Sequence, residues 1–331
     1  MTVLVSDYCK YGDINQYIET HHAKSQQYAQ YRKRWKDNRS DLLFLLFEIT
    51  SRCNLKCLMC AHSIGYPQTP LMSDEIFRAG LEGIREMDIP SVSVNQANEA
   101  LLDKKIFERI RAVASLPNVV DIRMHTNAVL LNNDNSKRIL ESGLTRLLIG
   151  FDGFSPRVYE KMRCGAKYNL VLDNILRFLE LKKKMGVIFP VVRVSLVRSS
   201  VNEHEIGLWL DFWKEKVDYL AVQEYLTPVL DDSKSDLIAT SSLRAQIPYH
   251  LVSCEEPFER AIVRGNGDVI LCCSPFAVTM PVGNIKKRSL KEIWRGEKAN
   301  QLRTMFEENR WEEHPVCSRC LRISYQIEDK K

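Results

Sequence analysis

The sequence lacks an apolar run long enough to cross a membrane. Its most hydrophobic stretch, Leu42–Phe47, is closed by Asp41 and Glu48, whereas a membrane-spanning helix needs about 20 apolar residues. The N-terminal residues MTVLVSDYCKYGD also lack the basic and apolar segments of a secretory signal. We therefore expect a cytoplasmic protein that has no membrane partner, in which Leu42–Phe47 belongs to a buried strand.

A marked excess of charge and low-complexity tracts are missing as well. The 331 residues include 47 Lys and Arg against 42 Asp and Glu, a formal net charge of +5, and 45% of the residues are hydrophobic. These values are typical of a globular chain that can bury a sizeable core. A charge balance this even does not by itself indicate nucleic acid or a membrane surface as a partner.

Strand-length apolar runs alternate with helical patterns along most of the chain. Helical periodicity is clearest in Ser73–Met87, which opens with a Ser-Asp cap, and in Tyr168–Met185. The expected strands are Leu43–Ile49, Val92–Gln96, Val119–Met124, Arg146–Phe151, Val191–Val197 and Tyr219–Glu224. Six such units predict an α/β fold with a parallel sheet, either doubly wound or closing as a partial barrel.

Composition shifts divide the chain into four segments. A polar, Asp- and Ser-rich stretch begins at Thr227 and separates the βα units from a cysteine-rich end. There, Gly265-Asn266-Gly267 between two apolar runs, Arg260–Arg264 and Asp268–Cys272, is typical of a hairpin. The predicted segments are an N-terminal helical extension (1–42), a barrel (43–226), a linker (227–253) and a small α+β domain (254–331).

The N-terminal extension interleaves basic residues with aromatic ones such as Tyr28, Tyr31 and Trp35. This mixture occurs in nucleic-acid-binding helices. More often such a helix packs its aromatic rings on the domain and leaves its charges in water. We therefore do not expect nucleic acid as a partner.

Ten cysteines in a chain without an export signal should stay reduced, so clustered spacing favours metal binding over disulfides. The stretch SRCNLKCLMC places Cys53, Cys57 and Cys60 just after the first expected strand. In a parallel barrel, that loop lies at the end where catalytic sites are built. Three thiolates can hold three irons of a [4Fe–4S] cluster and leave the fourth iron open. The alternative is a structural zinc site completed by His62, but the position after a first βα strand favours the cluster.

The stretch EITSRCNLKCLMC resembles the signature loop of radical S-adenosylmethionine (radical SAM) enzymes. The resemblance extends over most of the chain beyond residue 43. It implies a partial (β/α)6 TIM-like barrel, in which the open iron binds the amino and carboxylate groups of S-adenosylmethionine (AdoMet). The cosubstrate would then be the fourth ligand of the cluster.

The same resemblance implies four contacts to AdoMet. Glu99, in ANEA where the family usually has Gly-Gly-Glu-Pro, would accept from the ammonium group. Asp152 lies in GFDG where Ser-x-Asp-Gly is usual, so Gly150 replaces a hydroxyl that could meet the ribose. Arg193 would reach the carboxylate, unless it only caps the barrel mouth. The backbone of Met59 would meet the adenine.

The C-terminal segments GNGDVILCC and PVCSRC resemble the SPASM or twitch extension of radical SAM enzymes, which binds auxiliary clusters. Four cysteines, Cys254, Cys272, Cys317 and Cys320, would saturate one auxiliary [4Fe–4S] cluster. Cys272 and its neighbour Cys273 should point to opposite faces of a strand, and the family spacing favours Cys272. A zinc ribbon with four cysteine ligands is the alternative.

Together these features predict a radical SAM enzyme that cleaves AdoMet to a 5′-deoxyadenosyl radical and abstracts hydrogen from a small molecule. The short cysteine pattern resembles that of enzymes acting on sugar or aminocyclitol carbinols, by dehydrogenation or epimerisation. For epimerisation, Cys273 and Cys164 are the candidate hydrogen-atom donors. An electron donor such as flavodoxin or ferredoxin is the expected partner.

Two alternatives remain open from the sequence. One is a radical SAM enzyme that modifies a peptide. The more remote one is a non-catalytic protein that binds zinc and nucleic acid.

Overall fold

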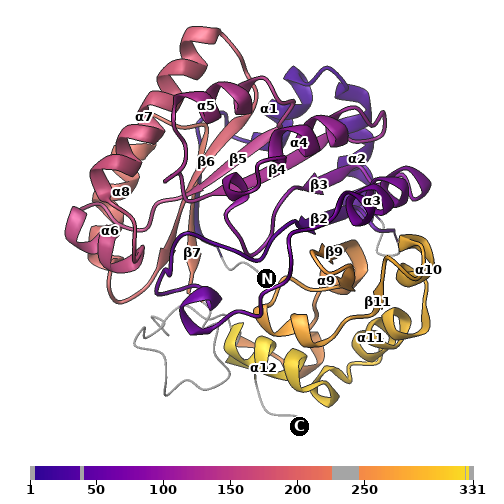
Figure 1. Cartoon of the computed structure of the whole chain (residues 1–331). Coiled ribbons are helices and arrows are strands. Elements are labelled where there is room, and N and C mark those ends of the chain that lie inside the picture. Colours follow the sequence, from indigo (N-terminus) through magenta and orange to yellow (C-terminus); the bar gives the residue numbers. More distant parts are fainter. Residues whose placement is uncertain (1–3, 38–40, 226–245, 325, 328–331) are drawn as a thin grey trace.

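The computed structural model describes residues 4–37, 41–225, 246–324 and 326–327. A ten-stranded sheet organises it, in the order β1-β7-β6-β5-β4-β3-β2-β9-β10-β11 (Figure 1). Neighbouring strands from β2 to β7 all pair in parallel and the sheet does not close. These six strands are β2 (Phe44–Glu48), β3 (Ser91–Ser93), β4 (Asp121–Thr126), β5 (Arg146–Gly150), β6 (Val191–Arg198) and β7 (Tyr219–Glu224). The predicted α/β fold with a partial barrel is confirmed.

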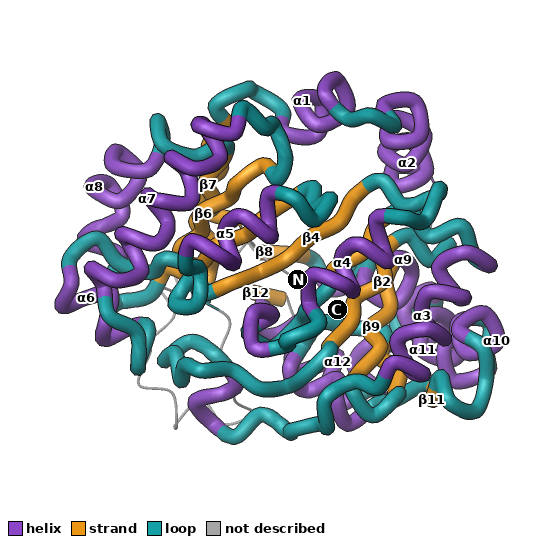
Figure 2. The backbone as a smooth tube through the Cα atoms, turned by 45° about the horizontal axis from the view of Figure 1, so that its top comes forward, coloured by secondary structure: helices purple, strands orange, loops and turns teal. Residues whose placement is uncertain are grey.

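Helices between the strands cover the outer face of this sheet, as α7 and α8 do beside β6 and β7 in Figure 2. The helix α3 starts where Ser73 Oγ accepts from Ile76 N, and α7 ends at Gly186, which has a left-handed φ of 64°. Alternate strand residues, such as Leu147 and Val194, pack beneath the helices in the main core. The helices are α3 (Asp74–Glu86), α4 (Ile106–Ala114), α5 (Asn133–Leu140), α6 (Pro156–Met162), α7 (Tyr168–Met185) and α8 (Ile206–Trp213).

The N-terminal segment contains one element that the sequence did not lead us to expect. Residues Leu4–Cys9 form β1, which pairs antiparallel with β7. The helices α1 (Ile14–His21) and α2 (Ser25–Asp37) follow. Tyr28 and Tyr31 of α2 are buried against Val120 and Val191 at the start of barrel strands, so the aromatic rings of this segment pack on the barrel.

The cysteine-rich C-terminal segment continues the barrel sheet instead of forming a separate one. The predicted hairpin is present as β9 (Arg260–Arg264) and β10 (Asp268–Ile270), and β9 pairs in parallel with the edge of β2. The remaining elements are β11 (Gly283–Asn284), α9 (Glu256–Glu259), α10 (Leu290–Trp294), α11 (Glu297–Glu307), α12 (Pro315–Ser324), and the two-stranded pair β8 (Gln246–Ile247) and β12 (Gln326–Ile327). Most of the predicted linker, residues 227–245, lies outside the described residues.

Short 3-10 helices punctuate the loops: η1 (Ala61–Ile64), η2 (Ala100–Leu102), η3 (Glu203–Glu205), η6 (Tyr249–Leu251), η7 (Pro275–Thr279) and η8 (Trp311–Glu313). Within the described ranges, no helix combines the length and apolar character that crossing a membrane requires.

Candidate active site

The loop that carries Cys53, Cys57 and Cys60 follows β2 and is held by its backbone. Lys56 N donates to the Cys164 carbonyl oxygen at 3.1 Å, and Leu58 N donates to that of Met162 at 3.0 Å. The three-cysteine loop therefore runs beside the turn that follows α6. The loop lies at the carboxyl ends of the barrel strands, as expected from the sequence.

The three thiols lie within electrostatic reach of one another. Burial raises the pKa of Cys57 to about 12; the charge of Arg163 opposes this shift, while those of Asp152, Cys60 and Cys53 contribute to it. Burial also raises the pKa values of Cys53 and Cys60. Such thiols become thiolates when a strongly bound cation stabilises the charge. No disulfide joins any of the ten cysteines, all of which lie in the described part of the chain.

This donor set fits a cluster better than a single zinc ion. His62, the proposed fourth zinc ligand, has its Nε2 2.8 Å from the Ala97 carbonyl oxygen. A cubane needs thiolates spread around its corners.

Glu99 lies in the loop after β3 and is completely surrounded by protein. Its carboxylate accepts from Thr126 Oγ1 and from Asn127 N, both at 2.8 Å, and from Leu101 N at 3.2 Å. Burial raises the pKa of Glu99, while the hydrogen bonds from Asn127 and Thr126 oppose the shift. Glu99 is thus fixed by the end of the neighbouring strand β4.

Asn127 links this carboxylate to the cysteine loop. Its Nδ2 lies 3.8 Å from Cys53 Sγ and donates to Asn54 Oδ1 at 2.8 Å. The following residue, Ala128, has a left-handed φ of 58°. Glycine adopts that conformation without strain, so the alanine here holds a conformation that its side chain disfavours.

Asp152, after β5, is fully buried and forms an ion pair with Arg163 through the guanidinium Nε. Its Oδ1 also accepts from Val197 N at 2.6 Å. Burial opposes the charge of Arg163, but the Asp152 carboxylate and the Cys57 thiol outweigh it and raise the pKa of Arg163. A Cβ at Gly150 would lie 1.7 Å from Arg163 Nη2. Gly150 therefore makes room for a guanidinium, on a side chain that is 14% exposed, beside the cysteine loop.

Arg163 is a site residue that the sequence did not lead us to consider. It lies in MRCG, in which only the adjacent Cys164 was considered as a candidate site residue. The sequence held one signal for Arg163. Gly150 lacks the usual side chain, which leaves space that a long side chain such as an arginine can fill. Only the fold shows that the two positions meet.

The other two expected AdoMet residues lie at the edges of this group. Arg193 is on β6, where its register partners are Leu148 and Tyr219. The side chain of Met59 is half-buried and packs with apolar neighbours such as Met162 and Val158.

Cysteines expected to bind the auxiliary cluster lie on two apolar clusters of the structure. Cys254 and Cys317 pack on the same apolar cluster as Trp311. Burial raises the pKa values of both thiols to about 12, and the charge of Cys320 contributes in each case. Cys272 and Cys273 both pack on a different apolar cluster, on the barrel side, and their two thiols interact with each other. The expectation that they point to opposite faces of a strand is wrong, because β10 already ends at Ile270. Soft thiolate donors in this number suit an iron–sulfur cluster.

The backbone of Cys273 contacts both the SPASM segment and the loop after β3. Its N donates to Glu256 Oε2 at 3.2 Å, and its carbonyl oxygen accepts from Gln96 Nε2 at 3.2 Å. Glu256 also contributes to raising the pKa of Cys254, after burial. The second candidate donor, Cys164, has its Sγ 3.3 Å from the Lys161 carbonyl oxygen, and its own carbonyl oxygen accepts from Lys56 N of the cysteine loop.

Two family models match the chain. Residues 47–205 match the radical SAM superfamily, and residues 254–321 match SPASM, an iron–sulfur cluster-binding domain. The chain therefore belongs to the radical SAM superfamily and carries a SPASM domain. This combination implies a [4Fe–4S] cluster, AdoMet and an auxiliary cluster.

Curated relatives include GTP 3′,8-cyclases. The protein from Limosilactobacillus fermentum is 26% identical over 224 residues, which are 62% of this chain and 63% of the relative. The one from Lactiplantibacillus plantarum is 30% identical over 177 residues, 52% of this chain and 51% of the relative. The chain thus spans about half to three fifths of the length of these relatives.

Solved structures agree in fold. BtrN in complex with AdoMet and 2-DOIA has a TM-score of 0.55 at 19% identity, covering 88% of this chain and 97% of BtrN. SuiB from Streptococcus suis bound to S-adenosylmethionine has a TM-score of 0.64 at 14% identity, covering 85% of this chain and 72% of SuiB. For anSMEcpe with bound AdoMet the TM-score is 0.62 at 17% identity, with 88% of each chain covered. At these identities the likeness concerns the fold alone.

Proposed function

We propose that this radical SAM enzyme acts on a small sugar or aminocyclitol carbinol, by dehydrogenation or epimerisation. The contact between Gln96 and Cys273 carries the proposal, because it brings the cysteine pair of the hairpin to the loop that holds Glu99. The cysteines of the SPASM segment suffice for one four-cysteine cluster and one further thiol. BtrN, whose structure contains AdoMet and 2-DOIA, matches along nearly its whole length and supports a small-molecule substrate.

In this proposal Cys53, Cys57 and Cys60 hold the cluster that binds AdoMet, and Cys254, Cys272, Cys317 and Cys320 hold the auxiliary cluster. When bound, the first cluster and AdoMet supply a 5′-deoxyadenosyl radical that takes hydrogen from the substrate. The chain's own residues orient AdoMet and keep water away from it.

The AdoMet contacts are divided among the strand ends. Glu99 would accept from the ammonium group, since a carboxylate has acceptor sites beyond those used by Thr126 and Asn127. Asp152 would meet the ribose directly or through Arg163, and Met59 would offer its backbone to the adenine. Arg163 joins Arg193 as a candidate for the AdoMet carboxylate, because its Nη2 lies over Gly150 beside the cysteine loop.

Cys273 is the favoured hydrogen-atom donor if the reaction is an epimerisation. Its backbone is tied to the loop of Glu99 through Gln96, whereas Cys164 faces the carbonyl of Lys161 in the turn after α6. A flavodoxin or ferredoxin in the reducing cytoplasm would supply electrons.

The test uses anaerobically reconstituted, reduced protein with AdoMet and a pool of sugars, aminocyclitols and GTP in D2O, with all products analysed by mass spectrometry. A product lighter by about two mass units indicates dehydrogenation, since a carbinol then loses two hydrogens. An isomer heavier by about one unit indicates epimerisation, because a donor thiol exchanges its proton with solvent. Cys273→Ala would then abolish deuterium incorporation while Cys164→Ala would retain it.

Other outcomes separate the rivals. Formation of 5′-deoxyadenosine without conversion of a carbinol overturns the proposed substrate. Conversion of GTP indicates the activity named for the curated relatives. A peptide substrate is the second candidate, favoured by the match to SuiB, whose structure is also known bound to the precursor peptide SuiA. If no 5′-deoxyadenosine forms despite intact clusters, the proposed radical chemistry is wrong.

A further inference from the structure

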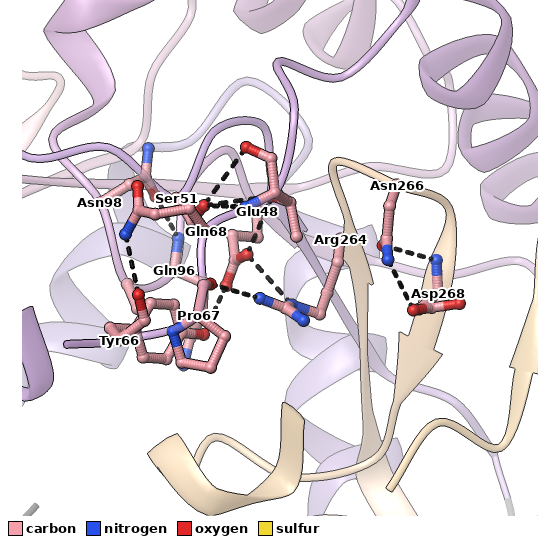
Figure 3. Close-up of polar contacts among 12 residues, drawn as sticks. Glu48, Ser51, Tyr66, Pro67, Gln68, Gln96, Asn98, Arg264, Asn266 and Asp268 are labelled. Atoms are coloured by element: carbon pink, nitrogen blue, oxygen red, sulfur yellow. Dashed lines mark hydrogen bonds and ion pairs between the residues drawn. The ribbon is translucent and has the colours of Figure 1, made fainter. Parts of the chain in front are cut away.

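A buried ion pair joins the barrel to the SPASM segment. Glu48 is the last residue of β2, and Arg264 is the last residue of β9. They are register partners in the parallel pairing of these strands, and Arg264 Nε lies 3.1 Å from Glu48 Oε1. The side chains are only 5% and 0% exposed. Figure 3 shows the arginine reaching across from the hairpin to the carboxylate.

Both partners also hold the segment that follows Cys60. Tyr66 Oη donates to Glu48 Oε2 at 2.7 Å, and Arg264 Nη2 donates to the Pro67 carbonyl oxygen at 3.0 Å (Figure 3). The guanidinium therefore bridges two chain segments on either side of the cysteine loop, one of which precedes Cys53 by five residues.

The hairpin turn is seated against the same segment. A Cβ at Gly265 would lie 2.1 Å from the Pro70 carbonyl oxygen and 2.9 Å from Thr69 Oγ1. Thr69 is in turn hydrogen-bonded to Ser51, two residues before Cys53. The residues on both sides of the cysteine loop are thus fixed by contacts with each other and with the hairpin.

We infer that Arg264, although it belongs to the SPASM segment, is a positioning residue for the AdoMet site. It acts through Glu48 and Pro67, which lie before and after the three cysteines. This inference rests on the proposed assignment of Cys53, Cys57 and Cys60 to the AdoMet-binding cluster.

The chemistry of the Glu48–Arg264 ion pair explains why no other residue would replace Arg264 equally well. Removing one partner of a buried ion pair leaves the other charge uncompensated. Lysine retains the charge, but an ammonium group lacks the planar fork with which arginine reaches a carboxylate and a carbonyl together. Replacement of Arg264 should therefore release the segment that contains Tyr66 and Pro67.

The test compares reconstituted holoenzymes of wild type, Arg264→Gln, Arg264→Lys and Glu48→Gln. AdoMet affinity, the electron paramagnetic resonance signal of the reduced cluster with and without AdoMet, iron content and thermal midpoint are measured. Arg264→Gln should weaken AdoMet binding about tenfold or more, the usual cost of losing an outer-shell partner of a metal site, and change the spectral response to AdoMet. Arg264→Lys should fall between Arg264→Gln and wild type, and iron content should stay at the wild-type level.

Arg146→Gln is the matched control, because Arg146 also forms a buried pair in the barrel sheet, with Asp121 Oδ1 at 2.9 Å. It contacts α2 at the opposite end of the strands, so its loss should lower the thermal midpoint and leave AdoMet affinity within about twofold. Should Arg264→Gln fail to fold, Arg264→Lys and Glu48→Gln carry the same comparison.

AdoMet affinity and spectrum like those of wild type in the Arg264 variants would overturn the inference, whatever their stability. Failure of the wild type to bind AdoMet at a reducible cluster would instead refute the proposed ligand assignment. The two failures are therefore distinguishable in one set of samples.

Discussion

Gly150 shows how an absent side chain shapes this site. The hydroxyl that is usual at this position in the family is missing, and the guanidinium of Arg163 lies in the space. That guanidinium is paired with Asp152 and influences the pKa values of the three cysteines. A local departure from the family pattern is thus matched by a second residue 13 positions further along the chain.

Gly150→Ala should displace Arg163, because the new Cβ would overlap Nη2 at 1.7 Å. We expect AdoMet affinity to fall about tenfold, as for other outer-shell changes at metal sites. Equilibrium binding of AdoMet to the reconstituted protein measures the effect. Gly207→Ala in α8 is the control, since a Cβ there meets nothing within 4 Å. Equal affinities in the two variants would contradict this account of Arg163.

His22 gives the fold a dependence on pH. Its Nδ1 accepts from Lys24 N at 2.9 Å, and burial, aided by the charge of Lys24, lowers its pKa. The unfolded chain therefore takes up a proton near pH 6.5, before the folded protein does. Stability contributed by neutral His22 is complete above that pH and is lost as the pH falls towards the folded pKa.

The thermal midpoint of the wild type should accordingly decrease when the pH is lowered from 7.5 to 5.5. The thermal midpoint of His22→Asn should decrease less over the same interval, because Asn does not titrate. Scanning calorimetry at both pH values checks this expectation. Parallel curves for the two proteins would show that His22 is equally protonated in the folded and unfolded chains.

At the scale of elements, the sequence predicted the helices, strands and hairpin that are specified by residues close together in the chain. The predicted helix Tyr168–Met185 has the bounds of α7, because its apolar spacing and the following Gly186 are both visible in the sequence. The barrel strands and the hairpin were found for the same reason. The pairing of β9 with β2 was not predicted, because backbone hydrogen bonds between distant strands leave no periodic trace.

The candidate site divides in the same way. Cysteine spacing indicated Cys53, Cys57 and Cys60 without any knowledge of the fold. Arg163 and Arg264 were missed because each acts through a residue distant in sequence. An arginine in a loop or at a strand end carries no local sign of its partner.

The cap of α3 offers a test of one local signal. Ser73→Ala removes the hydroxyl that accepts from Ile76 N at 3.3 Å. We expect a loss of about 1 kcal/mol in the free energy of unfolding, the typical effect of losing an N-cap. Urea denaturation measures it. An unchanged midpoint would mean that packing of α3 in the core compensates for the cap.

At the scale of the whole molecule, the barrel and the SPASM segment share one sheet and are not independent units. The strand β2 is buried along its whole length, with β3 on one edge and β9 on the other. An unpaired apolar edge strand is prone to associate with other chains.

A fragment comprising residues 1–253 should therefore self-associate, although it contains every strand of the partial barrel. Size-exclusion chromatography with light scattering would show species larger than a monomer, whereas the full chain is the reference under the same conditions. A monomeric, folded fragment would mean that the β2 edge is covered by something other than β9.

The pairing of β2 with β9 also determines when the sheet can be completed during synthesis on the ribosome. Glu48 and Arg264 are 216 residues apart in the sequence. At a synthesis rate of about 5–20 residues per second, the first of them waits roughly 10–40 s for its partner to be made. During that interval the nascent chain exposes both an apolar strand edge and three cysteine thiols, so we expect it to depend on chaperones until its last quarter emerges.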